Sequence, residues 1–186
     1  AMRSLLSAPA PVFVAVVPAR PLDSVLLIVT LQCVFRPALK QAGLSGRRVI
    51  YDEAASGADF LSCFEEGLRH CGLGAVVADV ARLSMTASRR LQLAAETSGA
   101  LGLAIRRWRR QTEVADFGQP TASATRWRVS VLPSVGLPVP GVGRPRWLLE
   151  LIRARAGECA DFEVEACDAK GRLAYNRCLA GGLALP

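Results

Sequence analysis

The amino-acid sequence predicts an α/β fold in which parallel strand–helix–strand units are extended by antiparallel strands towards the C-terminus. Between residues 24 and 107, apolar runs of strand length alternate with amphipathic segments of helix length, which is the pattern of right-handed parallel βαβ units. Beyond residue 124, apolar and polar residues alternate with period two, as in antiparallel strands. The chain has 186 residues, enough for one domain with one hydrophobic core.

Two apolar runs lie near the N-terminus, VFVAVV at residues 12–17 and SVLLIVTL at residues 24–31. Six residues separate them, whereas the crossover between two parallel strands needs a dozen or more. We therefore expect that the two runs do not form a βαβ pair. Residues 1–23 are assigned to an N-terminal extension, and residues 24–180 to the α/β domain.

A short helix and a longer one follow, each with one apolar face. The short helix is expected over residues 35–43, and a strand, RRVIYDE, over residues 47–53. The longer helix is expected over residues 56–72, where Glu65 and Arg69 are four residues apart and should form an exposed ion pair. Its apolar stripe consists of Phe60, Leu61, Phe64, Leu68 and Cys71.

The clearest strand–helix–strand unit spans residues 75–107. Its first strand, AVVADV, is apolar on both faces, as a central parallel strand should be. Ser84 or Thr86 can cap the helix that begins near Ala87, and Gly99 can end it. On this helix the inward side chains are expected to be Leu91, Ala94 and Ala95, and the outward ones Arg89, Arg90 and Glu96.

The last third of the chain contains four segments with period-two alternation. They are TRWRVSVL (125–132), RWLLELIRAR (146–155), DFEVEAC (161–167) and GRLAYNRC (171–178). A Pro/Gly-rich loop over residues 133–145 joins the first two, and the turn sequence DAKG between the last two favours a hairpin. We therefore expect the parallel strands to continue into an antiparallel sheet within the same domain.

The positive charge of the chain comes mainly from arginine. The net charge is +7, and lysine occurs only at Lys40 and Lys170. Arginine suits ion-paired interfaces and nucleic-acid binding, but a GC-rich coding sequence produces the same bias, and both alternatives stay open. The six cysteines contain no CxxC pair, and His70 is the one histidine. We therefore expect no metal site, no cofactor and a reducing compartment.

Catalytic motifs are absent from the sequence. A phosphate-binding loop has the form GxxxxGK[ST], and neither Lys40 nor Lys170 stands in such a context. Asp79 lies near the end of AVVADV, at a place where a carboxylate could hold magnesium, but its lysine and Ser/Thr partners are missing. We interpret Asp79 as structural or as the vestige of a cofactor site. Because GxSxG and HExxH are also absent, we expect that the protein is not an enzyme.

The three tryptophans are flanked by arginine, and the clusters around Trp108 and Trp127 supply the candidate binding residues. Arg126 and Arg128 share one face of a strand, while Trp127 between them points to the other face. Stacking on tryptophan with arginine–phosphate contacts would suit single-stranded nucleic acid, and an acidic protein partner would suit these residues equally. A core tryptophan between solvated arginines is the alternative. The remaining candidates are Arg106, Arg107, Trp108, Arg109 and Arg110.

Several collinear segments between residues 24 and 175 resemble the bacterial ImuA family. The most specific are TASRRLQLAAE (86–96) and TRWRV (125–129), accompanied by EEGLRHCGLGAVVADV and PRWLLELIRARAG. The resemblance implies a RecA-like core, which here lacks the phosphate-binding loop. Family members usually have a longer region before the first parallel strand, so a truncated chain and a short family member both stay open for residues 1–23.

The resemblance also implies a function in the SOS response to DNA damage, in translesion synthesis beside ImuB and an error-prone polymerase, with contact to ImuB or RecA. Our leading hypothesis is a non-catalytic accessory protein of DNA repair that uses a degenerate RecA-like domain as a protein-binding platform. The alternatives are a single-stranded DNA-binding module and a cell-division inhibitor similar to SulA. No apolar stretch reaches the roughly 20 residues of a membrane helix without proline or charge, so we expect a cytoplasmic protein.

Overall fold

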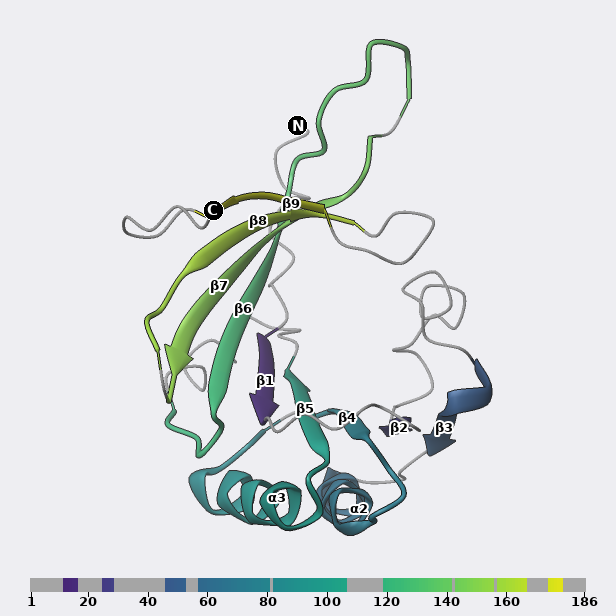
Figure 1. Cartoon of the computed structure of the whole chain (residues 1–186), viewed down its shortest axis with the longest axis vertical. Helices are drawn as coiled ribbons and strands as arrows, with labels where there is room; N and C mark the ends of the chain where they lie inside the picture. The colour runs from purple at the N-terminus through teal and green to yellow at the C-terminus, as the bar shows by residue number, and fades with distance from the viewer. Residues whose placement is uncertain are drawn as a thin grey trace.

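The computed structural model describes nine segments of the chain. Residues 107–110 of the first arginine cluster lie outside these segments, and so do the short helix expected over residues 35–43 and the turn DAKG. The strands within these segments form one mixed sheet in the order β3-β2-β4-β5-β1-β6-β7-β8-β9 (Figure 1). The described segments are residues 12–16, 25–28, 46–52, 57–80, 82–106, 119–141, 143–155, 157–166 and 174–178.

Parallel pairing joins β3, β2, β4 and β5, and antiparallel pairing joins every later pair of neighbours along the sheet. This arrangement confirms the expected α/β fold with a parallel and an antiparallel half. The strands are β1 (Val12–Val16), β2 (Val25–Ile28), β3 (Val49–Asp52), β4 (Ala75–Asp79), β5 (Leu101–Arg106), β6 (Thr125–Leu132), β7 (Arg146–Ala154), β8 (Asp161–Glu165) and β9 (Ala174–Cys178), and a short 3-10 helix, η1 (Gly46–Arg48), precedes β3.

Strand β1 lies in the middle of the sheet and joins its two halves. It is antiparallel to β5 on one side and to β6 on the other. Strands β1 and β2 are not neighbours, in agreement with the expectation that the two N-terminal apolar runs do not form a βαβ pair. Residues 12–16, assigned on sequence alone to an N-terminal extension, therefore pair within the sheet.

Two helices, α2 (Gly57–Arg69) and α3 (Met85–Ser98), lie side by side against one face of the parallel half (Figure 1). The Oγ of Ser84 accepts a hydrogen bond from the N–H of Ala87 at 3.1 Å, and Gly99 ends α3 with a φ of 75°, so both expected caps are confirmed. Neither described helix combines the length and apolar character needed to span a membrane. The buried side chains of α3 include the expected Leu91, Ala94 and Ala95.

The core lies between these two helices and strands β4 and β5. Phe64 and Leu68 of α2 are almost completely buried. Gly102 of β5 packs against them: a Cβ at this position would be in van der Waals contact with both methyl groups of Leu68, at 3.4 Å. Cys71 was expected in the apolar stripe of α2, but it is exposed, because the helix ends at Arg69 before the stripe reaches it.

Strands β6 and β7 extend beyond the part of the sheet that the helices cover (Figure 1). They pair from Thr125 opposite Ala154 to Leu132 opposite Arg146, with one irregularity after Arg126. The Pro/Gly-rich loop that joins them contains no helix or strand in its described residues. In Figure 1 this green loop projects from the end of the molecule opposite the helices.

Candidate interaction surfaces

Three of the predicted binding residues lie near the centre of the sheet. Arg106 ends β5, and Arg126 and Arg128 belong to β6. Strand β1 runs between β5 and β6, so that Val12 is directly opposite both Arg106 and Arg128. Directly opposite residues share a face of the sheet, which places these arginines on one face. The other predicted binding residues, Arg107, Trp108, Arg109 and Arg110, lie outside the described residues.

Arg128 forms an ion pair across the sheet. Its Nε donates a hydrogen bond to Oε2 of Glu150 on β7 at 2.5 Å, and its Nη2 donates to Oε1 of the same carboxylate. The hydrogen bond to Glu150 raises the pKa of Arg128 further above its usual value. Two bonds to one carboxylate fix the guanidinium in place. Arg128, predicted as a binding residue, is therefore already engaged within the chain.

Arg126 lies beside two other arginines. Its Nη2 donates hydrogen bonds to the carbonyl oxygen of Gln119 at 2.9 Å and to Oγ1 of Thr121 at 2.8 Å. Partial burial lowers the pKa of Arg126, and the like charges of Arg153 and Arg106 lower it further. Because three positive charges gather here, this part of the sheet would attract anionic groups.

Trp127 has a packing role within the sheet. Its ring centroid lies 6.0 Å from that of Phe162 on β8, with the two ring planes tilted by 38°, a common arrangement of aromatic pairs. Trp127 is half-buried. This contact supports the interpretation of a packing tryptophan that lies between two arginines along the strand.

Asp79 lies at the end of β4, opposite Ile105 of β5, and is half-buried. Within the described residues, no three His, Cys, Asp or Glu side chains come together in a group that could hold a metal ion.

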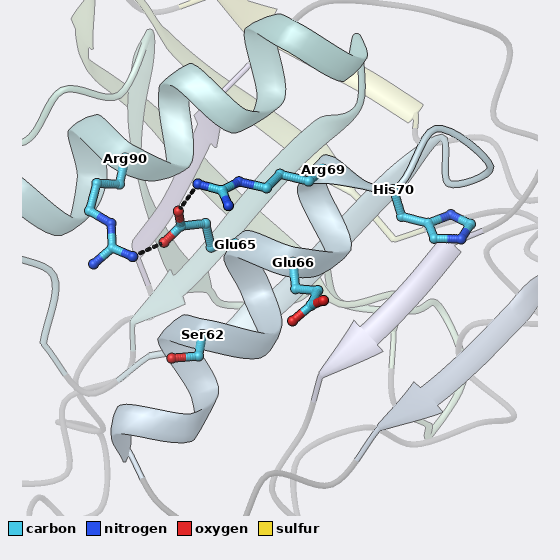
Figure 2. A pocket seen from close by; sticks show the side chains of 6 residues that line it. All are labelled: Ser62, Glu65, Glu66, Arg69, His70 and Arg90. Atoms are coloured by element: carbon cyan, nitrogen blue, oxygen red, sulfur yellow. Dashed lines mark hydrogen bonds and ion pairs between the residues drawn. The ribbon is translucent and has the colours of Figure 1, made fainter.

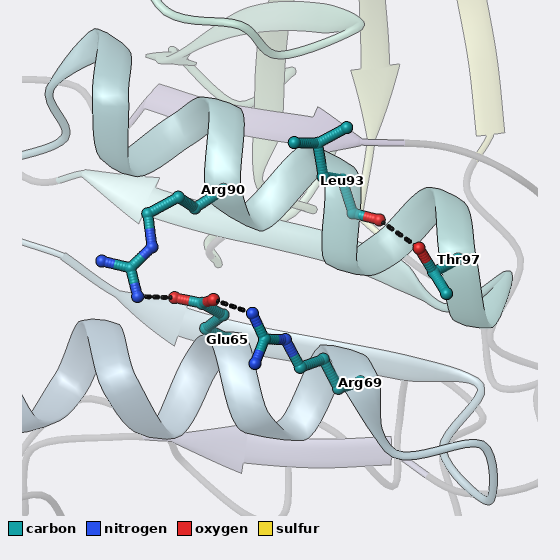
Figure 3. A network of polar contacts seen from close by, with 5 residues as sticks. All are labelled: Glu65, Arg69, Arg90, Leu93 and Thr97. Atoms are coloured by element: carbon teal, nitrogen blue, oxygen red, sulfur yellow. Dashed lines mark hydrogen bonds and ion pairs between the residues drawn. The ribbon is translucent and has the colours of Figure 1, made fainter.

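A buried carboxylate joins the two helices. Glu65 of α2 has 7% of its surface exposed. Its Oε1 lies 2.5 Å from Nη2 of Arg69, and its Oε2 lies 2.5 Å from Nη2 of Arg90 on α3 (Figure 3). The Glu65–Arg69 ion pair predicted from the sequence spacing is confirmed, but its carboxylate is buried and not exposed as expected. The carboxylate is buried because α3 packs beside α2 and places Arg90 against it.

The outer surface of the two helices is hollowed beside this ion pair, over a volume of about 410 Å³. Arg69 and Arg90 expose about two-thirds of their side chains, 68% and 66%. Both oxygens of Glu65 are engaged by these arginines. The residues around the hollow, shown in Figure 2, are Ser62, Glu65, Glu66, Arg69, His70 and Arg90.

Two polar contacts connect helix α3 to residues just before β6 and just after β7. The Oγ of Ser88 accepts a hydrogen bond from the N–H of Ala122 at 2.9 Å. Nη1 of Arg155, at the end of β7, lies 3.6 Å from Oε1 of Glu96. The segment TASRRLQLAAE on α3 therefore contacts residues that flank β6 and β7.

The sequence is similar to curated proteins named Protein ImuA from two strains of Caulobacter vibrioides, NA1000 / CB15N and ATCC 19089 / CIP 103742 / CB 15. Each is 36% identical to the chain over 141 residues, which is 73% of the chain. Over these residues the chain belongs to the ImuA family. It spans 57% of the length of these two ImuA proteins.

The family resemblance stated from the sequence is thereby confirmed. No family model matches the chain. Among solved structures, the crystal structure of SulA from Pseudomonas aeruginosa is 27% identical to this ImuA-family chain, with a TM-score of 0.42, and the match covers 48% of this chain and 74% of the SulA chain.

Proposed function

We propose that this chain is a non-catalytic accessory protein of damage-induced translesion DNA synthesis, in which a degenerate RecA-like domain acts as a protein-binding platform. The observation that carries the proposal is the 36% identity to ImuA over 141 residues. Contacts of the segment TASRRLQLAAE with Ala122 and Arg155 support it, because they connect α3 to residues beside β6 and β7. The partners would be ImuB, an error-prone polymerase or RecA.

In this proposal the RecA-like core has kept its packing and lost its phosphate chemistry. Neither lysine stands in a phosphate-binding context, and a lysine contact to the β- and γ-phosphates is central to hydrolysis by this class of fold. Purified protein should therefore hydrolyse no ATP above background. An ATPase rate that Asp79→Ala abolishes would contradict the non-catalytic part of the proposal.

Direct binding measurements test the platform part of the proposal. The purified chain is immobilised, and purified ImuB, error-prone polymerase and RecA are passed over it one at a time in physiological salt. We expect at least one of the three to bind with a Kd in the micromolar range or tighter. If none of them binds, the proposed platform function is wrong.

Single-stranded DNA binding is a second candidate function, favoured by the gathering of Arg126, Arg153 and Arg106 on the sheet. Such binding should weaken steeply as salt rises, and Arg126→Ala/Arg153→Ala should flatten the salt dependence. The matched control is Arg47→Ala/Arg144→Ala, which removes the same charge from two exposed positions. Equal affinities of the two double variants would count against a specific site.

A further inference from the structure

The end of β6 and the loop that follows it carry a cluster of exposed apolar side chains. Of the eight large apolar side chains that are exposed in the described part of the chain, four lie between residues 131 and 139. Figure 1 shows the loop projecting away from the body of the protein. We name residues 131–143 the apolar arm. The four side chains are Val131, Val135, Leu137 and Val139, with 78%, 55%, 48% and 63% of their surface exposed.

The composition of the apolar arm differs from that of the surface around it. Its sequence, VLPSVGLPVPGVG, contains no charged residue, although 21% of the whole chain is charged. Removing it from water therefore requires no desolvation of an ion. Contiguous exposed apolar surface on a soluble protein commonly marks an interaction site. The apolar arm is thus suited to burial against another molecule.

The two limbs of the apolar arm lie close together at its base. A Cβ at Gly143 would overlap the carbonyl oxygen of Val135 and lie 3.3 Å from Cβ of Ser134. Farther out, a Cβ at Gly141 would lie 3.3 Å from Cδ1 of Leu137. Glycine at both positions allows this close approach. The arm therefore has a specific shape at its base, which larger residues at position 143 would disrupt.

Prolines limit the conformations of the outer part of the arm. Pro138 and Pro140 alternate with Leu137 and Val139 in the sequence LPVP, and the ring of proline fixes φ near −65°. A segment with restricted dihedral angles loses less conformational entropy when it docks. Apolar, proline-containing segments of this kind fit grooves lined by aromatic side chains.

We propose that the apolar arm inserts into an apolar groove of another protein, and that acidic side chains line the rim of this groove. Arg144, exposed at the base of the arm, and the net charge of +7 are complementary to such a rim. A second copy of the chain would carry the same positive charge and be repelled. A membrane surface fits less well, because the arm has none of the Trp or Phe residues typical of interfacial segments.

This inference rests on the proposed function and names the element of the chain that would bind. The experiment compares the full chain with Val135→Ser/Leu137→Ser/Val139→Ser for binding to purified ImuB, error-prone polymerase and RecA. We expect the triple variant to bind the responsive partner at least about tenfold more weakly, because three side chains at the centre of the contact are lost. Its thermal midpoint should match that of the unchanged chain, because these side chains are exposed.

Leu93→Ser provides the matched control, since Leu93 on α3 is 48% exposed, as Leu137 is. This control should bind as the unchanged chain does, and an equal loss in both variants would overturn the proposal by indicating non-specific adsorption. Unchanged binding of the triple variant would overturn the role of the arm and leave the proposed function standing. Binding of none of the three partners by the unchanged chain would overturn both.

The acidic rim and the other possible occupants need separate measurements. Arg144→Glu should slow association with the partner at low salt, and the difference should shrink as salt rises; an unchanged association rate would overturn the acidic rim. Sedimentation with vesicles of phosphatidylglycerol and phosphatidylcholine that the triple variant loses would overturn the protein groove in favour of a membrane. Self-association that the triple variant loses would overturn it in favour of a second copy.

Discussion

The two halves of the sheet use the same residue types in different ways. In the parallel half, α2 and α3 cover one face, the large apolar side chains of α2 are buried, and arginines of both helices engage a buried carboxylate. In the antiparallel half, β6 and β7 end in the apolar arm, where valine and leucine lie in water. The difference indicates that the parallel half supplies stability and that the arm is available for binding.

Truncating an apolar side chain in each half should give the largest contrast. Phe64→Ala in α2 should lower the free energy of unfolding by about 3–5 kcal/mol, because it leaves a cavity in the core. Val139→Ser in the arm should change it by less than about 0.5 kcal/mol. Urea unfolding of both variants measures the two values. Similar losses in the two variants would remove the basis for the comparison.

Removing both arginines around Glu65 should give the next largest effect. Arg69→Ala/Arg90→Ala leaves the buried carboxylate without its two partners and should cost about 2 kcal/mol, less than for a fully buried pair because both arginines are largely exposed. Arg47→Ala/Arg144→Ala removes the same charge and should cost less than about 0.5 kcal/mol. Equal unfolding free energies for these two variants would mean that Glu65 does not join the helices.

Ser88→Ala tests the joint between the helices and the antiparallel half. The variant leaves the half-buried N–H of Ala122 without its acceptor and should cost about 1 kcal/mol. Hydrogen exchange at the Ala122 amide should become faster. Ser62→Ala, on the exposed side of α2, is the control and should leave this amide unchanged. Unaltered exchange at Ala122 in the Ser88 variant would contradict the joint.

Replacing the two prolines of the arm by glycine, with Val135, Leu137 and Val139 unchanged, should have a smaller effect than the triple serine variant. Pro138→Gly/Pro140→Gly should weaken partner binding about threefold to tenfold, because the freer chain loses more entropy on docking. Pro120→Gly, outside the arm, should bind as the unchanged chain does. Titration calorimetry should place the change in the entropy of binding. A loss confined to the enthalpy would point to lost contacts instead.

The smallest predicted effect concerns thiol reactivity. Burial raises the pKa of Cys63 on α2, and the neighbouring Asp52 raises it further, so less thiolate is present at a given pH. Iodoacetamide at pH 8 should therefore label Cys63 more slowly than the exposed Cys159, and peptide mapping by mass spectrometry can follow both sites. Raising the pH should increase the rate at Cys63. Equal labelling of the two thiols at pH 8 would contradict this.

Local patterns predicted much of the fold. The caps Ser84 and Gly99 marked α3 to within two residues, and period-two alternation marked β6 over its full length. These elements could be predicted because their signals lie within a few neighbouring residues. The central position of β1 was not predicted, because it depends on pairing with strands about 90 or more residues away.

The candidate surfaces were predicted less completely for the same reason. Spacing along α2 paired Glu65 with Arg69, but the burial of Glu65 depends on Arg90 of another helix. The ion pair that engages Arg128 depends on Glu150 of a neighbouring strand. The loop over residues 133–145 was recognised by its proline and glycine content, whereas the exposure of its apolar side chains required the packing of the whole protein.

The central position of β1 has a consequence for folding during synthesis on the ribosome. A ribosome makes β1 before its two neighbours, β5 and β6, which emerge about 85 to 115 residues later, an interval of roughly 5 to 20 s at bacterial rates. Throughout that interval neither edge of β1 has its final neighbour. We therefore expect the nascent chain to depend on chaperones most strongly at this five-residue strand, because unpaired strand edges associate readily with other chains.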